Sequence, residues 1–419
     1  MQHWSSVVAE WGQAARAAAR CLALADTDQK NAWLTRAKER LDAGAERLLS
    51  ANAADVADAQ TAGLAPALID RLRLTPARLA ALSQGLLEIR ALPDPIGQVI
   101  EGSRRPGGLE IRKVRVPVGV LLFIYESRPG VTVDAAALAM KSGNAILLRG
   151  GKEARRSNAE LQTHLAAALA DVGLPAAAIQ QVTDPDRQLL TALLHAGDWI
   201  DLCIPRGGEG LIRAVAAEAA MPVLKHYRGN CHLYVDAAAD LEMARRLLYN
   251  GKCQRPGTCN ATESLLVHAA VAERFLPVAL AELQTHGVEI RGCPTTCRLF
   301  PPARPAQDAD FAAEFLDLIL SVRVVPDLEA ALDHVARFGS GHTEAIVTDH
   351  GPTAARFLRE VDAAAVLVNA STRLHDGSVF GLGAEIGIST DKFHARGPCG
   401  LVELTTYKYH VLGSGHVRH

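Results

Sequence analysis

The chain has 419 residues, of which 49% are hydrophobic and 21% are charged, and its formal net charge at pH 7 is -2. The length predicts two or three domains, and the composition excludes a disordered or collagen-like chain. No basic patch dominates, and the longest apolar run is only Val118–Tyr125. We therefore expect neither nucleic acid nor a membrane as a partner.

In chain order, the sequence predicts a helical region and then two rounds of strand–helix alternation. Residues up to about 92 are Ala-rich with an apolar period of 3.6, which is typical of helices. Residues 109–117 alternate like an exposed strand, and residues 118–125 are continuously apolar like a buried one. Strands and helices then alternate, with a domain boundary near Gly229, which favours α/β domains built on doubly wound parallel sheets. The segment from Cys399 predicts a strand with no core partner nearby in sequence, and such a strand can pair with another subunit.

The cysteines are scattered along the chain. There are eight of them, and the N-terminal residues have helical apolar spacing rather than the pattern of a secretory signal. We therefore expect reduced thiols and a cytoplasmic location. Cys293 and Cys297 have the spacing of half a zinc site, but no second Cys or His pair accompanies them, so we expect no metal.

Two glycine-rich turns that follow apolar strands are candidates for phosphate binding. The turn "RGGKE" contains Arg149, Gly150 and Lys152, and the turn "PRGGEG" contains Gly207 and Gly208. Backbone N–H groups at a helix start suit an anion, and two such turns favour a nucleotide at the carboxyl edge of the sheet. The spacing does not match GxGxxG, so glycines that only make tight turns remain the alternative.

Cys259 lies in "QRPGTCNAT", after a Pro-Gly pair. A thiol attacks carbonyl carbon only as the thiolate, and backbone N–H groups at a turn or helix start can stabilise a thiolate and an oxyanion. A buried core thiol is the alternative, and spacing alone does not decide between them. Nothing local favours any one of the dispersed histidines as a base: His226, His232, His342, His375 and His394.

Several blocks of sequence carry a resemblance to a known family. They include "PVGVLLFIYESRPGVTVDAAALAMKSG", "IPRGGEGLIRAV", "QRPGTCNATE", "FGSGHTEAIVT", "VNASTR" and "FGLGAEIGIST", in this order. From about Trp33 to about Tyr409 the chain resembles the γ-glutamyl phosphate reductases (glutamate-5-semialdehyde dehydrogenases) of proline biosynthesis, within the aldehyde dehydrogenase superfamily. The resemblance implies an NADP-binding domain (1–98 and 116–229), a catalytic domain (230–385) and oligomerisation strands (99–115 and 399–419).

The resemblance also implies a reaction. The thiolate of Cys259 attacks L-glutamyl 5-phosphate, phosphate leaves, and NADPH reduces the thioester to L-glutamate 5-semialdehyde. A CoA-acylating or hydrolytic aldehyde dehydrogenase, or a non-catalytic scaffold, would share the fold and stays as an alternative. Implied partners are a second copy of the chain, as a dimer or tetramer, with glutamate 5-kinase as a further candidate.

For the cofactor, the resemblance places Arg149, Gly150 and Lys152 beside the adenosine ribose, where a basic side chain favours the 2′-phosphate of NADPH. It places Gly207 and Gly208 beneath the diphosphate, and aligns Glu314 with the glutamate that holds the nicotinamide ribose.

For the substrate, the assignment is less defined. Glu126, Ser127 or the backbone N–H of Cys259 are the candidates for the oxyanion partner. The substrate carboxylate and ammonium are expected to meet Arg128 and the loops that contain Asn369 and residues 383–390. Lys225 or His226 stands where hydrolytic relatives carry a glutamate base, so we expect the thioester to resist water and yield to phosphate.

Overall fold

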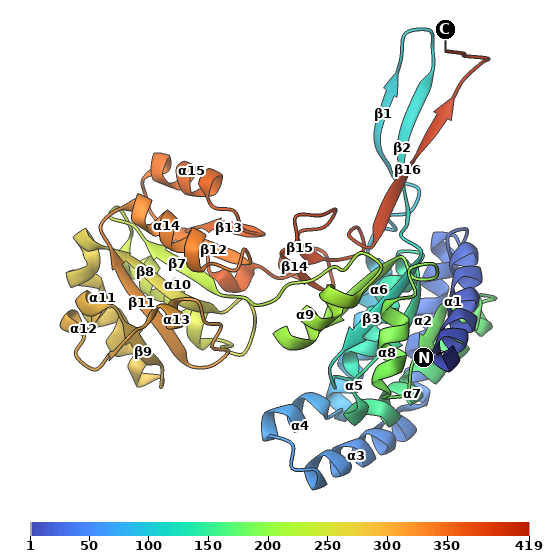
Figure 1. Ribbon diagram of the computed structural model, residues 1–419, viewed down its shortest axis with the longest axis horizontal. Helices are drawn as coiled ribbons and strands as arrows, with labels where there is room; N and C mark the ends of the chain where they lie inside the picture. Colours follow the sequence, from blue (N-terminus) through green and yellow to red (C-terminus); the bar gives the residue numbers. More distant parts are fainter. Residues whose placement is uncertain (1, 419) are drawn as a thin grey trace. The chain divides into compact units, whose positions relative to one another are not determined.

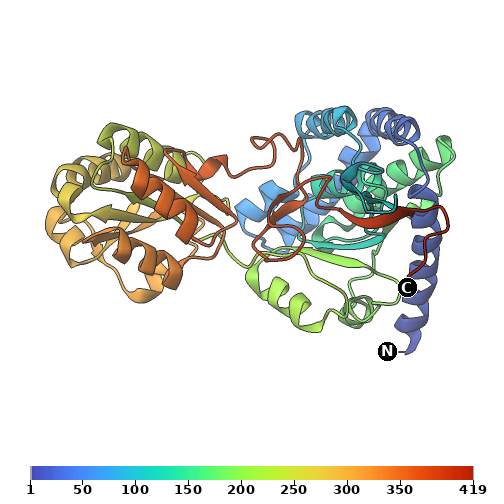
Figure 2. The ribbon, with the colours of Figure 1, turned by 90° about the horizontal axis from the view of Figure 1, so that it is seen from above.

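The computed structural model describes residues 2–418, which divide into two compact units. The first unit comprises the chain up to Lys225, Gly381–Gly387 and the chain from Cys399, and the second comprises His226–Phe380 and Ile388–Pro398. Each unit has its own parallel sheet with helices around it (Figures 1 and 2), so the predicted α/β class is confirmed. Among the described residues, no helix has both the length and the apolar character that crossing a membrane requires.

Five helices begin the first unit: α1 (Gln2–Leu22), α2 (Thr27–Ala43), α3 (Ala45–Thr61), α4 (Pro66–Leu72) and α5 (Pro76–Ala91). The side chain of Asp26 accepts the backbone N–H of Gln29 at the start of α2, and Thr75 accepts that of Arg78 at the start of α5. Trp33, Ala37 and Leu41 are spaced by four residues, so α2 buries them on one face. The predicted helical region is confirmed.

A four-stranded parallel sheet with the order β5-β4-β3-β6 forms the core of the first unit. Its strands are β3 (Val120–Tyr125), β4 (Ala145–Arg149), β5 (Ile179–Gln181) and β6 (Leu202–Arg206). The connecting elements are α6 (Gly130–Lys141), η1 (Lys152–Ala154), α7 (Arg155–Asp171), η2 (Ala176–Ala178), α8 (Arg187–Leu194) and α9 (Glu209–Glu218). The chain winds outward from β3 in both directions, which is the doubly wound order. Ile124 pairs with both Arg149 and Pro205, so the turns after these three strands lie at one edge.

A three-stranded antiparallel sheet also belongs to the first unit, in the order β1-β2-β16. Its strands are β1 (Val99–Arg104), β2 (Glu110–Pro117) and β16 (Thr405–Leu412), and Figure 1 shows them extending away from the helices of this unit. The predicted strand near the C-terminus therefore exists, and its partner within the chain is β2, with Thr405 opposite Pro117 and Leu412 opposite Glu110. Every residue of β1, and every residue of β16 after Thr405, is exposed.

The second unit contains a seven-stranded parallel sheet in the order β10-β9-β11-β8-β7-β12-β13. The strands are β7 (Cys231–Val235), β8 (Thr262–His268), β9 (Glu289–Gly292), β10 (Arg304–Pro305), β11 (Ile319–Val325), β12 (Thr343–Val347) and β13 (Ala365–Val368). The helices are α10 (Leu241–Cys253), α11 (Ala269–Thr285), α12 (Pro294–Leu299), α13 (Asp308–Phe311), α14 (Leu328–Phe338), α15 (Gly351–Glu360) and η3 (Thr372–Leu374). Two short strands, β14 (Gly387–Ser389) and β15 (Gly397–Cys399), pair with each other.

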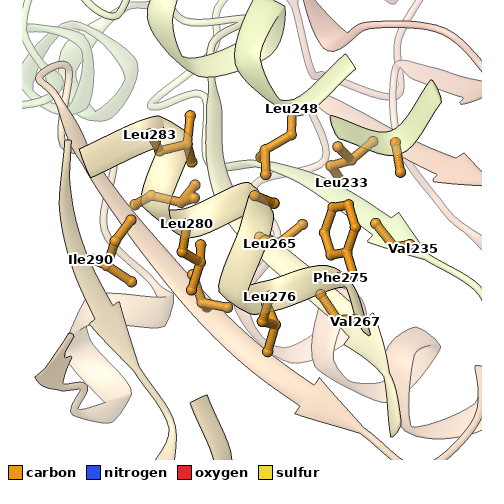
Figure 3. Close-up of a cluster of buried hydrophobic side chains, with 14 of the residues drawn as sticks. Leu233, Val235, Leu248, Leu265, Val267, Phe275, Leu276, Leu280, Leu283 and Ile290 are labelled. Atoms are coloured by element: carbon orange, nitrogen blue, oxygen red, sulfur yellow. The ribbon is translucent and has the colours of Figure 1, made fainter. Parts of the chain in front are cut away.

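Two apolar layers hold this sheet, one on each face. Leu233 and Val235 of β7 point to the layer shown in Figure 3, where they meet side chains of α10 and α11 such as Leu248 and Phe275. Tyr234 points to the opposite face, with Ile346 and with Phe357 of α15. This alternation along β7 explains why the strand is buried over its whole length. The sheet is therefore a rigid frame for the loops at its edges.

Candidate active site

Cys259 lies in a turn between the end of α10 and the start of β8, and its side chain is half-buried. It does not begin a helix, so a helix dipole does not stabilise its thiolate. The Sγ–H of Cys231 donates to the carbonyl oxygen of Cys259 at 3.2 Å. A Cβ at Gly229 would overlap that same carbonyl, so only glycine allows this approach of the two segments. The backbone N–H of Gly229 in turn donates to Oε1 of Glu314 at 2.8 Å.

Two histidines approach the thiol. One ligand atom from each of His226, Cys259 and His342 can be chosen so that all three lie within 4.8 Å of one another. His342 is fully buried, whereas His226 is half-buried, and their ring centroids are 5.6 Å apart. Sequence reasoning gave no ground for choosing either histidine as a base for the thiol. The sheet order β8-β7-β12 brings them together, because each residue precedes one of these three neighbouring strands.

A hydrogen-bonded chain fixes the ring of His342. Its Nδ1 lies 2.6 Å from Oγ1 of Thr343, and that hydroxyl lies 2.7 Å from Nδ1 of His375. Burial lowers the pKa of the His375 imidazole to about 4, so this ring is neutral at pH 7. One hydroxyl therefore connects two buried imidazoles.

Arg373 is a further residue that sequence reasoning missed, although it ends the block "VNASTR". It lies on η3, where its Nε donates to Oε1 of Gln254 at 2.9 Å and its Nη1 donates to Oγ1 of Thr258 at 3.0 Å. Burial lowers the pKa of Arg373, but a guanidinium stays charged in proteins. A fixed cation therefore stands beside the residue that precedes Cys259, where it favours the thiolate.

A buried ion pair joins the two ends of the Cys259 loop. Nζ of Lys252, in the last turn of α10, lies 2.6 Å from Oε2 of Glu263 on β8, and both side chains are fully buried. The other carboxylate oxygen accepts the backbone N–H of Leu316 at 3.1 Å. Burial raises the pKa of Glu263 to about 7 and lowers the pKa of Lys252. This ion pair therefore holds the two ends of the loop together, and each of its buried charges is compensated by the other.

A cavity of about 240 Å³ lies in the first unit, at the carboxyl ends of β4 and β5. Its lining includes Arg149, Gly150 and Lys152, three of the residues predicted to face the nucleotide. The other lining residues are Gly151, Arg155, Asn158, Gln181, Val182, Thr183, Asp184, Pro185, Arg187 and Leu190. A Cβ at Gly150 would overlap the side-chain amide of Asn158, so the turn needs glycine. Four cationic side chains against one carboxylate suit an anionic ligand.

The cationic side chains that line this cavity differ in burial and in hydrogen bonding. Nη2 of Arg149 donates to the carbonyl oxygens of Pro185 at 3.3 Å and Asp186 at 3.4 Å, and burial lowers the pKa of its guanidinium. Arg149 thus holds the loop after β5 in place. Lys152, Arg155 and Arg187 are exposed at the cavity.

The turn at Gly207 and Gly208 already holds a carboxylate. The backbone N–H of Gly208 donates to Oε1 of Glu126 at 2.7 Å, and a Cβ at Gly207 would lie 2.9 Å from that oxygen. A diphosphate can reach this N–H only when Glu126 moves away. Ser127 donates from Oγ to Oε2 of Glu153 at 2.5 Å. The segment Glu126 to Arg128 belongs to the first unit, whereas Cys259 belongs to the second.

Asn369 has a structural role that the sequence did not indicate. Its backbone has a φ of 53°, and its side-chain amide accepts from the N–H of Thr348 and donates to the carbonyl of Thr348, each at 3.0 Å. Both ends of the amide are therefore engaged with the end of β12, and a left-handed backbone is tolerated better by Asn than by most residues.

Comparisons with known proteins cover almost the whole chain. The aldehyde dehydrogenase family profile matches residues 5–291. The gamma-glutamyl phosphate reductase of Rhodopirellula baltica is 54% identical over 404 residues, which are 96% of this chain and 93% of that protein. That of Anaeromyxobacter dehalogenans is 56% identical over 410 residues, 97% of this chain and 96% of that protein. The crystal structure of the Thermotoga maritima gamma-glutamyl phosphate reductase matches with a TM-score of 0.97 and 45% identity, covering 98% of this chain and 100% of that one.

Proposed function

Because the chain belongs to the aldehyde dehydrogenase family and, within it, to the gamma-glutamyl phosphate reductases, we propose that it reduces L-glutamyl 5-phosphate to L-glutamate 5-semialdehyde in proline biosynthesis. The observation that carries this proposal is the extent of the similarity. A relative of that name is 54% identical over 96% of the chain, so the similarity extends over both units.

Cys259 is the nucleophile of this reaction. Its thiolate adds to the acyl carbon, the C–O bond to phosphate breaks with its electrons leaving on phosphate, and a thioester forms. One ring nitrogen of His226 and one of His342 lie within 4.8 Å of the thiol, and Arg373 adds positive charge next to the loop. Once the thioester has been reduced, the tetrahedral adduct collapses to the aldehyde and returns the thiolate. Arg373 and the backbone N–H of Cys259 are the groups we assign to the substrate's anionic oxygens in the second unit.

A nicotinamide cofactor supplies the hydride when it is bound, as throughout this family. The cavity fits the adenosine end of such a cofactor, because a glycine turn after β4 allows close approach and exposed cations surround it. We assign NADPH rather than NADH, since Lys152 offers an ammonium to a 2′-phosphate. Ser127, Arg128, Gly207, Gly208 and Glu314 remain candidates for the cofactor and substrate contacts that the resemblance implies.

The exposed sheet edges and the free cysteines suggest how the protein assembles and where it is located. The exposed outer edges of β1 and β16 have unpaired backbone groups and carry apolar residues such as Val99 and Val411, which suits pairing with a second copy in a dimer or tetramer. Eight free cysteines are consistent with a reducing, cytoplasmic location. Glutamate 5-kinase, which produces the acyl phosphate, is a candidate partner because such a substrate is short-lived in water.

A phosphate titration tests the proposed reaction in reverse. The enzyme is given glutamate 5-semialdehyde and NADP, and the formation of NADPH is followed while inorganic phosphate is raised from zero to saturation. We expect turnover to require phosphate, because the resemblance places Lys225 or His226, rather than a carboxylate, at the position of the hydrolytic base. A rate independent of phosphate would assign the chain to the hydrolytic class, and a rate that depends on CoA instead would assign it to the acylating class.

A further inference from the structure

We propose that Cys259, His226 and His342 form a binding site for a thiophilic divalent cation, with Zn²⁺ as the best fit, and that the bound ion reversibly blocks the thiol. His226 lies 33 residues before Cys259, and His342 lies 83 residues after it, so no sequence motif links the three side chains. They meet because each segment leads into a neighbouring strand: β7, β8 or β12.

The distances suit a tetrahedral ion after a small adjustment. The three ligand atoms lie within 4.8 Å of one another. Bonds of about 2.0–2.3 Å around zinc place neighbouring ligand atoms about 3.5 Å apart, so a pair of ligand atoms has to close by up to about 1.3 Å. The side chains of Cys259 and His226 are half-buried and can change rotamer while the backbone stays in place, whereas His342 is buried and fixed.

The orientation of His342 is that of a prepared metal ligand. A histidine that binds a metal usually hydrogen-bonds through its second ring nitrogen, which fixes the ring and its tautomer. Here Nδ1 of His342 is held 2.6 Å from the hydroxyl of Thr343, and that hydroxyl is itself held by His375 at 2.7 Å. The proposal therefore assigns Nε2 of His342 to the ion.

The donor set selects the kind of ion. One sulfur and two imidazole nitrogens favour Zn²⁺ and its neighbours among the transition metals, and disfavour Mg²⁺ and Ca²⁺, which prefer oxygen. Three protein ligands leave a fourth position for water. Binding forms the S–Zn bond and releases the thiol proton to solvent, with no change in oxidation state. The positive charge of Arg373 opposes the cation, so we expect reversible rather than permanent occupancy.

Binding of the ion and inhibition by it are separate consequences. The metal site depends only on the three side chains, whereas inhibition rests on the proposed role of Cys259 as nucleophile. A sulfur bound to zinc no longer has its lone pair available for attack on an acyl carbon, so a chelator should restore activity.

Cobalt(II) tests the site directly. Metal-free protein is titrated with Co²⁺ in a buffer that does not bind metals, and the visible spectrum is recorded. We expect one equivalent to produce tetrahedral d–d bands together with a thiolate-to-cobalt charge-transfer band, and Zn²⁺ to remove both. Cys259→Ala should abolish the charge-transfer band. His226→Gln should weaken cobalt binding by more than about tenfold, in line with the loss of a direct ligand.

Two control variants test whether the metal binds elsewhere in the chain. Cys297→Ser removes half of the Cys293–Cys297 pair, and His350→Gln removes an imidazole on the same unit that hydrogen-bonds to Thr353. Both should retain the spectrum of the unchanged protein. A charge-transfer band that survives in Cys259→Ala but disappears in Cys297→Ser would overturn the proposal. His342→Gln serves as a third ligand variant if circular dichroism shows that it folds.

An activity measurement separates this proposal from the proposed function. Zinc inhibition that EDTA reverses, with the cobalt spectrum dependent on Cys259, supports both. A cobalt spectrum dependent on Cys259 in a protein that keeps full turnover with zinc bound supports the metal site and overturns Cys259 as nucleophile. Zinc inhibition without any cobalt–thiolate band overturns the metal site and leaves the nucleophile standing.

Discussion

The two parallel sheets carry their candidate sites at opposite edges. In the first unit, the cavity lies at the carboxyl ends of β4 and β5, whereas in the second unit Cys259, His226 and His342 precede the amino ends of β8, β7 and β12. Helices that follow the strands begin at the carboxyl edge, so their positive ends favour an anion there. At the amino edge this help is missing, and a thiolate depends on side chains such as Arg373 and the two histidines.

The two sites also differ in how firmly they are held. Exposed cations surround the cavity of the first unit, and one of them can be lost while others remain. The Cys259 loop is fixed by the contact with Gly229, by two hydrogen bonds from Arg373 and by the buried pair of Lys252 and Glu263. We therefore expect graded effects from substitutions in the first site and severe effects in the second.

The largest effect is expected from Cys259→Ala. If Cys259 is the nucleophile, as proposed above, its removal eliminates the covalent route, so turnover should fall by more than about 10³-fold. Binding of NADPH, measured by fluorescence titration, should stay near that of the unchanged protein because the cavity belongs to the first unit. Cys253→Ala, at the end of α10, is the matched control and should keep most of the activity. Near-native turnover in Cys259→Ala would show that Cys259 is not the nucleophile.

The next largest effect is expected from breaking the buried ion pair of Lys252 and Glu263. Lys252→Met leaves the Glu263 carboxylate buried without its partner, so the free energy of unfolding should fall by about 3–5 kcal/mol. The double variant Lys252→Met/Glu263→Leu should recover much of this loss. Arg245→Met, which breaks partly exposed ion pairs with Glu242 on the same helix and with Glu282 on α11, is the control and should have a much smaller effect. Denaturant unfolding compares the variants, and equal losses for the two single variants would contradict the expected anchoring role.

Arg373→Lys tests whether the fixed guanidinium acts on the substrate. A lysine keeps the charge but cannot make both hydrogen bonds, to Gln254 and Thr258, in the same geometry. We expect kcat/KM to fall by about 10–100-fold, as for the loss of a charge-assisted hydrogen bond, while the melting temperature changes little. An unchanged kcat/KM would leave Arg373 with a structural role alone.

Lys152→Glu tests the cavity of the first unit, where we expect graded effects. A carboxylate at the cavity should repel a 2′-phosphate, so the Kd for NADPH should rise by about tenfold or more while the Kd for NADH changes less. Arg155 and Arg187 remain at the cavity and limit the loss. Arg20→Glu, an exposed residue of α1 outside the cavity, is the control. Equal weakening of both cofactors would show that Lys152 does not contact the 2′-phosphate.

Sequence alone indicated most of the fold. The continuously apolar run at 118–125 and the 3.6 period before residue 92 each reflect local burial, which a pattern of residues records directly. The family resemblance identified the γ-glutamyl phosphate reductases, and the comparisons confirm it. The residue roles drawn from that resemblance stay predictions, including those of Ser127, Arg128 and Glu314.

The sequence could not predict which residues lie next to Cys259, and the reason is physical. His342 meets the thiol only because β12 is placed beside β7, and strand order is a long-range property that no local pattern contains. The rule that ligands bind at the carboxyl edge of a parallel sheet predicts the cavity of the first unit but not the cluster at the amino edge of the second sheet. Likewise, nothing near Asn369 or Glu126 in sequence indicated that Thr348 and Gly208 would engage their side chains.

The smallest expected effect concerns pH and the packing of the second unit. Burial lowers the pKa of His334 to about 2, and its Nδ1 accepts a hydrogen bond from Nη1 of Arg323 at 3.3 Å. The unfolded chain binds a proton at this residue below a pH of about 6.5 and the folded chain does not, so stability falls as the pH drops below that value. Between pH 7 and 5.5 this group should remove about 1 kcal/mol of stability, and His334→Gln should abolish that part of the pH dependence. His350→Gln, at an exposed site of the same unit, is the control for the loss of an imidazole in denaturant unfolding. If the stabilities of His334→Gln and the unchanged protein varied with pH in parallel, His334 would have to be protonated in the folded state, and the apolar layer around it would be open to water.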